Sequence, residues 1–148
     1  MIALAGILAF ACSDSTSPPP PAPPTGPKPV VYELPATQSS GPALTVKANQ
    51  NVKITVTDSV SSNPDMYVPE CDHWTDANGI ADCDYVVSAP ECRGLPFMAL
   101  LGNVETDYFV VGTVFDSTFT DSVQLNLLIN DWVFSDNDGK FRITVLIK

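Results

Sequence analysis

The sequence predicts an all-β fold, a β-sandwich or jelly roll of about seven or eight antiparallel strands. Apolar and polar residues alternate in many short runs, which is the period of a pleated strand with one buried face. Residues typical of turns separate these runs, and no convincing amphipathic helix interrupts them. The clearest runs are 123–130 and 140–147, close to the C-terminus.

The composition fits a single domain that works outside the cytoplasm. The chain has 148 residues and a formal net charge of −10, with an isoelectric point near 4.1. A chain of this length forms one domain of ordinary size with tails. Its acidic charge argues against nucleic acid and against anionic membrane surfaces as partners.

The N-terminal segment, residues 1–12, resembles a bacterial lipoprotein signal peptide. Residues 1–11 form an apolar run too short to span a bilayer, and Cys12 follows a small residue, as in a lipobox. The segment departs from the usual pattern in having no Lys or Arg before the run and in having Phe10 near the cleavage position. We expect lipidation at Cys12 and anchoring to a bacterial membrane, with simple secretion as the alternative.

Residues 13–29 are expected to be a tether. They hold most of the prolines of the chain. Proline lacks an N–H group and fixes φ, so the segment favours extended polyproline II and cannot join a sheet. This leaves residues 30–148 as the folded domain.

The expected strands follow from the alternating runs between turn residues. Asn49 and Asn51 suit a tight turn, so we expect the second and third strands to form a hairpin. The expected strands are 30–34, 43–48, 51–57, 95–102, 107–115, 122–130 and 140–147. The expected core residues are Phe97, Leu100, Phe109, Val111, Val114, Leu125, Leu127, Phe141, Ile143 and Val145.

The irregular segment 58–94 contains three cysteines, Cys71, Cys83 and Cys92. Outside the cytoplasm two of them are expected to form a disulfide, and we favour Cys71–Cys83, although sequence alone does not fix the pairing. A zinc site using Cys71 and His73 is disfavoured, because the spacing lacks a closely paired second cysteine. In the same segment Trp74 and Tyr67 are either a platform for the apolar face of a sugar ring or aromatic side chains that fix the loop against the sandwich.

The acidic loop 131–139 is the main candidate site. It gathers Asp131, Asp136, Asn137 and Asp138 with almost no positive charge. Crowded carboxylates repel one another unless water or a cation screens them, and oxygen ligands without His or Cys suit Ca²⁺. The alternative is a polar turn, because Asp, Asn and Gly are common in turns. The spacing excludes an EF-hand.

Four segments resemble the C-terminal half of PA-I galactophilic lectin-like domains. They are PFMALLGN at 96–103, FVVG at 109–112, LLIND at 127–131 and DNDGKFRITV at 136–145. A weaker likeness covers NVKITVT at 51–57 and Asn63-Pro64. The resemblance implies a jelly-roll β-sandwich that binds one Ca²⁺, which in turn holds two hydroxyls of galactose.

The resemblance also assigns site residues. Asp131, Asp136 and Asn137 would ligate calcium through their side chains, and Asn63 and a residue near Phe134 through backbone carbonyls. Their positions imply sugar contacts at Asn63, Asp131, Trp132 and Asp136. The loop after Asp131 is shorter than in the galactose lectin, and the family's sugar-binding His and Gln have no counterpart in TDANGIADCDY. This leaves open whether galactose-type glycans are the ligand.

Three classes of function remain. The first is a lectin-like module that binds carbohydrate through calcium. The second is a structural or adhesive surface domain that keeps the fold without binding sugar, since fold does not determine function. An enzyme is disfavoured, because the sequence shows no nucleophile elbow or Ser-His-Asp order.

Overall fold

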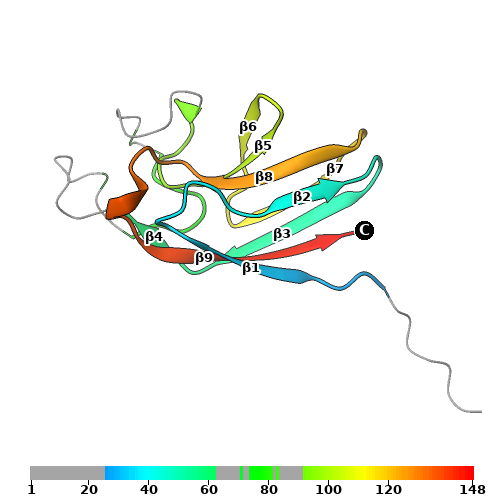
Figure 1. Cartoon of the computed structure of the whole chain (residues 1–148), viewed down its shortest axis with the longest axis horizontal. Helices are drawn as coiled ribbons and strands as arrows, with labels where there is room; N and C mark the ends of the chain where they lie inside the picture. Colours follow the sequence, from blue (N-terminus) through cyan, green and yellow to red (C-terminus); the bar gives the residue numbers. More distant parts are fainter. Residues whose placement is uncertain (1–25, 63–70, 72–73, 82, 84–91) are drawn as a thin grey trace, which may run out of the picture.

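The computed structural model describes residues 26–62, 71, 74–81, 83 and 92–148, and it confirms the all-β prediction. Two antiparallel sheets face each other as a sandwich (Figure 1). The strands are β1 (Val30–Pro35), β2 (Ala43–Val46), β3 (Asn51–Thr57), β4 (Val60–Ser61), β5 (Leu100–Val104), β6 (Asp107–Val110), β7 (Val114–Thr118), β8 (Val123–Ile129) and β9 (Asp138–Ile147). A short 3-10 helix, Phe134–Asp136, lies between β8 and β9.

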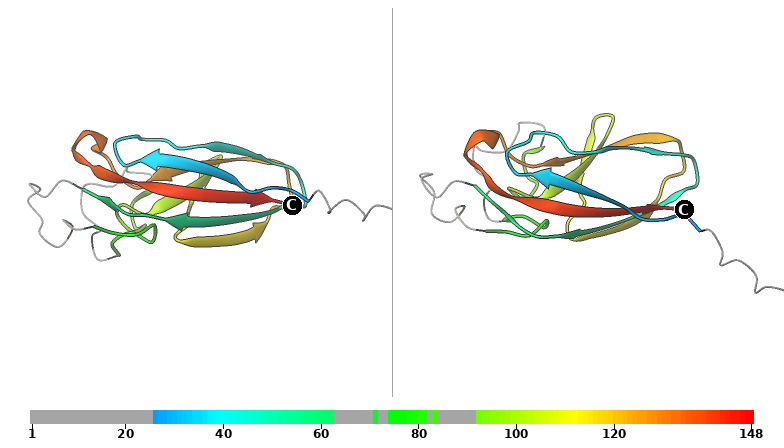
Figure 2. Two further views of the ribbon diagram at one scale, coloured as in Figure 1. Left: turned by 90° about the horizontal axis from the view of Figure 1, so that it is seen from below. Right: turned by 60° about the horizontal axis from the view of Figure 1, so that its bottom comes forward.

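The order of the strands differs from the simple hairpins expected from sequence. One sheet has the order β1-β9-β3-β7, with β4 paired to β9, and the other has the order β2-β8-β5-β6. Consecutive strands β2 and β3 therefore lie in different sheets, and so do β8 and β9. The predicted hairpin around Asn49 is wrong, because the chain there crosses from one sheet to the other. Figure 2 shows β1, β9 and β3 side by side along the long axis of the molecule.

The core lies between the sheets and follows the expected alternation. In β3 the even-numbered residues Val52, Ile54 and Val56 are buried and the intervening residues are not. Each sheet contributes buried side chains to this core. They are Phe141, Ile143 and Val145 from β9 in one sheet, and Leu125 and Leu127 from β8 in the other. Phe97, Leu100 and Val111 are also buried, whereas Phe109 is partly buried and packs against the core.

Two of the predicted strand boundaries are wrong. The strand expected at 95–102 begins only at Leu100, because Met98 has a positive φ of 59° and interrupts the extended backbone before it. The single strand expected at 107–115 is divided into β6 and β7, which belong to different sheets. Gly112, with φ of 63°, lies in the break. The break changes the phase of the alternation, so Val114 is 64% exposed rather than buried.

The start of β1 and the turn between β8 and β9 lie at opposite ends of the sandwich (Figure 1). Val30 at the start of β1 pairs with Val145 near the C-terminus. The turn between β8 and β9 lies at the end of the molecule away from the C-terminus (Figure 1). A tether that precedes β1 would therefore leave the acidic loop at the far end of the domain.

The predictions for the N-terminal segment are not tested by the structure. The signal peptide, Cys12 and most of the tether lie outside the described residues, and 26–29 are exposed without regular structure. Within the described part of the chain, no helix is long and apolar enough to cross a membrane.

The disulfide prediction is confirmed. Cys71 and Cys83 are joined, with their Cα atoms 5.7 Å apart and a sequence separation of 12. This bond uses two of the sulfurs that the zinc alternative required. His73 and Tyr67 lie outside the described residues.

Candidate functional site

Asp131 is a buried carboxylate at the point where β8 ends. The residue before it, Asn130, joins the chain to the segment leading into β5, because its N–H donates to the Ala99 carbonyl and its carbonyl accepts the Met98 N–H. The chain then turns sharply, with the Asp131 N–H donating to the Ile129 carbonyl at 3.0 Å. This turn directs the Asp131 side chain inward, where the residue is only 5% exposed.

Both oxygens of Asp131 accept hydrogen bonds. Oδ1 accepts the backbone N–H groups of Trp132 at 2.5 Å and Val133 at 3.1 Å. Oδ2 accepts Nδ2 of Asn137 at 2.5 Å. The carboxylate thus connects the end of β8 to the residue that precedes β9, and it fixes the course of the loop between them.

Asn137 and Asp136 place two further oxygens in the same loop. The short 3-10 helix ends at Asp136, and Asn137 is buried beside β1, where its Nδ2 also donates to the Ala36 carbonyl at 3.1 Å. Both amide hydrogens of Asn137 are therefore used inside the protein. Its Oδ1 and the Oδ1 of Asp136 are buried and have no hydrogen-bond donor. Buried oxygens without a donor are rare and need an explanation such as a bound ion or water.

The electrostatics of the loop also favour a cation. Burial raises the pKa of Asp131 above its ordinary value, and the neighbouring Asp136 carboxylate raises it further, while the hydrogen bonds from Asn137, Val133 and Trp132 act in the opposite direction. The ionised carboxylate is therefore costly in this position. In the described part of the chain, the two ion pairs are Lys53–Asp116 and Lys140–Glu33, so neither supplies a positive charge to the loop.

The residues present fit calcium better than a transition metal. The described residues contain no group of three or more His, Cys, Asp and Glu side chains placed to hold a metal. The loop instead offers two carboxylates, one amide oxygen and nearby backbone carbonyls. An all-oxygen set of mixed charge is the kind of shell that Ca²⁺ accepts, and the two buried oxygens without donors match its need for ligands.

The structure brings together three of the predicted ligands and leaves others apart. Asn137 donates a hydrogen bond to Asp131, and the nearby Asp136 carboxylate raises the pKa of Asp131. The Phe134 carbonyl is in the same turn, where it accepts the Asn137 N–H at a long 3.4 Å. Asn63 lies outside the described residues, so its contribution stays a prediction. Trp132 is 58% exposed beside Asp131, a position from which it can reach a ligand.

Sequence reasoning missed two residues that shape the site. The Ala36 carbonyl at the end of β1 holds the Asn137 amide, although Pro35-Ala36 carries no motif that signals this contact. Ser62 is buried just beyond β4, whose Ser61 pairs with Asp138, and its hydroxyl donates to the Cys71 carbonyl at 3.1 Å. The alternation of β3 ends before this point, and no periodicity predicts the short β4.

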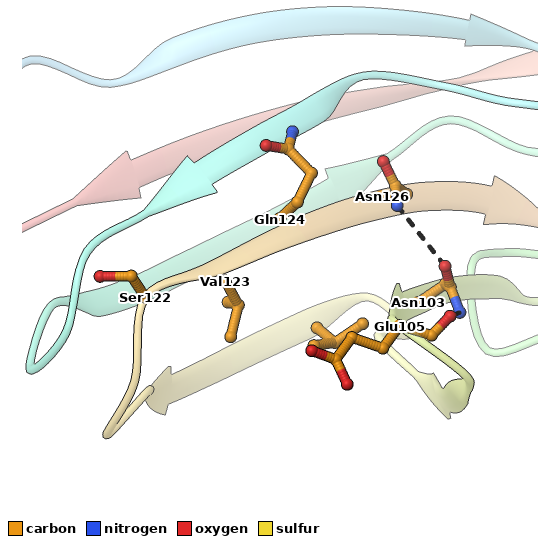
Figure 3. Close-up of a pocket in the computed structure, with 7 residues that line it drawn as sticks. Asn103, Glu105, Ser122, Val123, Gln124 and Asn126 are labelled. Carbon is orange, nitrogen blue, oxygen red and sulfur yellow. Dashed lines mark hydrogen bonds between the residues drawn. The ribbon is translucent and has the colours of Figure 1, made fainter.

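A second depression lies at the opposite end of β8. It measures about 300 Å³. Figure 3 shows Asn103 and Glu105 on one side of it and Gln124 and Asn126, from β8, on the other. Its amides partly bond to neighbours, since Gln124 Oε1 accepts the Thr45 hydroxyl and Asn126 Nδ2 donates to Asn103 Oδ1. None of its lining residues is aromatic. The loop at Asp131 is the stronger candidate, because only there do buried oxygens lack donors beside a buried carboxylate.

Comparisons with known proteins agree with the fold. No family model matches the sequence, and no curated protein matches it significantly. Among solved structures the chain is similar to the N-terminal domain of EclA, described as a PllA-like lectin. The TM-score is 0.57 at 16% sequence identity, over 80% of this chain and 95% of that one. This likeness shows a lectin-like β-sandwich fold. Membership of the PA-I galactophilic family stays a prediction.

Proposed function

We propose that this domain is a carbohydrate-binding module, and that a calcium ion held in the loop at Asp131 fixes two hydroxyls of the sugar. The main support is the pair of buried oxygens without donors, on Asp136 and Asn137, next to the buried Asp131 carboxylate. The fold adds support, since the similar solved structure is described as a lectin.

The residues have distinct roles in this proposal. Asp131 would give the metal a carboxylate oxygen while continuing to hold the Trp132 and Val133 N–H groups, which keeps the loop in place. Asp136 and Asn137 would supply the two oxygens that lack donors. When bound, calcium would supply open coordination positions that two neighbouring hydroxyls can occupy in place of water. Trp132 and the Asn63 region would border the bound sugar.

The arrangement of the domain suits a receptor on a cell surface. The acidic loop and the start of β1 lie at opposite ends of the sandwich (Figure 1). With Cys12 lipidated, the proline-rich segment would hold the domain several nanometres from the membrane, at about 3.1 Å per residue. The sugar site would then face away from the membrane to which the chain is anchored.

Calcium-dependent retention on immobilised sugars tests the proposal. Protein treated with a chelator is applied to galactose, glucose and mannose resins with and without added calcium. We expect retention on at least one resin only when calcium is present, and elution by either chelator or the free sugar. Calcium binding without retention on any glycan would instead support the structural or adhesive alternative. Release of cleaved sugar would indicate an enzyme.

A further inference from the structure

Trp74 is an unusually exposed tryptophan in a well-defined position. It is 55% exposed, although tryptophan is on average one of the more buried residues. The chain contains only two tryptophans, and the other, Trp132, follows Asp131 directly. A large aromatic side chain left in solvent is often a binding residue, because it offers much apolar area with little conformational freedom to lose.

The backbone around Trp74 is held against β4. The next residue, Thr75, exchanges two hydrogen bonds with Val60, with N···O distances of 2.9 and 3.1 Å. Val60 in turn pairs with Gly139 of β9. Trp74 is therefore attached, through one short strand, to the beginning of the strand that follows Asn137.

The indole ring itself lies against Gly139. A Cβ atom at Gly139 would be 2.6 Å from Cζ3 and 3.2 Å from Cη2 of Trp74, so the ring occupies the space that a side chain would fill. Gly139 also has a positive φ of 85°, which favours glycine. The six-membered ring is thus supported on one side by backbone, while more than half of the residue remains open to solvent.

The supported ring is close to the candidate calcium site. Gly139 is only two residues after Asn137, whose buried Oδ1 lacks a donor. The loop offers oxygens to a cation, and the neighbouring indole offers a flat apolar surface. A pyranose ring has the matching combination, because its hydroxyls project from the edge and its C–H bonds form apolar faces.

We propose that Trp74 is the stacking platform for the sugar, in contact with the apolar C–H face of a pyranose whose hydroxyls are held at the loop of Asp131. This inference rests on the proposed function and adds a selectivity to it. In a galactoside the axial hydroxyl is at C4, which leaves the C–H bonds of C3, C4 and C5 as an uninterrupted patch on the opposite face, and this patch fits a flat indole best.

Comparison of the wild type with Trp74→Phe isolates the emission of Trp74, because the chain contains two tryptophans. Calcium-saturated wild-type protein is titrated with methyl β-galactoside, methyl α-glucoside and methyl α-mannoside. We expect the emission to shift to shorter wavelength with saturation, most strongly for the galactoside, and calcium alone to cause a smaller change. In Trp74→Phe, where Trp132 is the reporter, the shift should be reduced. An unchanged Trp74 emission at saturating sugar overturns the inference.

Affinity measurements provide the second test. Trp74→Ala should weaken sugar binding by roughly tenfold to a hundredfold, the range that alanine substitutions produce at aromatic stacking contacts, and Trp74→Phe should lose less. Calcium affinity should be unchanged in both variants, which also shows that they are folded. Gln124→Ala, in the distant polar depression, is the matched control and should bind sugar as the wild type does.

The outcomes separate this inference from the proposed function. Wild-type affinity for sugar in Trp74→Ala would overturn the stacking role and leave the calcium-dependent site intact. Failure of the wild-type protein to bind calcium, or to bind any of the three glycosides with calcium bound, would overturn both.

Discussion

Replacement of Asp131 by alanine is expected to weaken calcium binding by about a hundredfold or more. Even residues that only orient metal ligands typically contribute tenfold to a hundredfold to metal affinity, and Asp131 would be a ligand itself. Its carboxylate is also the acceptor for Asn137 Nδ2 and for the Trp132 and Val133 N–H groups. The substitution therefore removes one ligand oxygen and releases the amide that orients a second.

Asp138→Ala is the matched control for Asp131→Ala. It removes the same charge from the same loop, but Asp138 is exposed and its Oδ1 accepts only the neighbouring Gly139 N–H. Its calcium affinity should stay within a few-fold of the wild type, which excludes a general loss of negative charge as the cause. Titration calorimetry on chelator-treated protein measures all three affinities. Equal losses in the two variants would contradict the site described here.

Thermal unfolding provides a second reading of Asp131→Ala. Calcium that binds only the folded state should raise the melting temperature of the wild type in proportion to the logarithm of its concentration, and the variant should lose this dependence. Without calcium, the variant loses the acceptor of buried N–H groups, which lowers its stability by roughly 1–3 kcal/mol. It also removes the unfavourable burial of a carboxylate whose pKa is raised by that burial, which increases its stability. These effects oppose each other, so the calcium response is the decisive quantity.

The sequence predicted the class of fold because each strand has one buried face. In β3 and β9 the alternation of side chains matches burial almost residue by residue, which is a local property of a pleated strand. The pairing of strands is not local. Nothing in the turn at Asn49 distinguishes a hairpin from a crossing between sheets, since both need only a reversal of the chain. Gly112 is the one residue that could have signalled the division of 107–115.

The residues of the candidate site could be singled out from the sequence, but their geometry could not. Asp131, Asp136 and Asn137 stand out because several polar oxygens are crowded in a loop without positive charge. Their order in sequence does not reveal that Ala36, about a hundred residues earlier, holds the Asn137 amide. Nor does it reveal that Gly139 provides a flat surface for Trp74. Both contacts depend on which strands flank β9, and that is decided by the packing of the whole sandwich.

Gly79→Ala should destabilise the domain far more than Gly94→Ala. Comparison of the two variants distinguishes the cost of a steric clash from the cost of backbone strain. Both glycines have positive φ, 73° and 87°, so alanine is strained to a similar extent at each, by about 1–2 kcal/mol. At Gly94 an added Cβ meets nothing within 4 Å. At Gly79 it would lie 2.5 Å from the Phe97 carbonyl oxygen and 2.6 Å from the Ala99 nitrogen, and both are backbone atoms that cannot rotate away.

Relief of this clash would require the loop to move away from the segment that leads into β5. The loop is joined there by hydrogen bonds between Ile80 and Phe97 in both directions and from the Leu100 N–H to the Ala77 carbonyl. Overpacking of this kind adds roughly 1–3 kcal/mol to the strain, so the total destabilisation by Gly79→Ala is expected to be about 2–5 kcal/mol. Urea unfolding of both variants measures the difference.

The same substitution links stability to the proposed platform. Trp74 and Thr75 precede Gly79 in one short loop, so a displaced loop should also change the exposure of the indole on Gly139. Gly79→Ala in the Trp132→Phe background is therefore expected to shift the Trp74 emission to longer wavelength before any unfolding, whereas Gly94→Ala should not. A difference in stability below about 0.5 kcal/mol between the two variants would mean that the loop is not docked on Phe97 and Ala99. Trp74 would then lack the rigid support that a stacking platform requires.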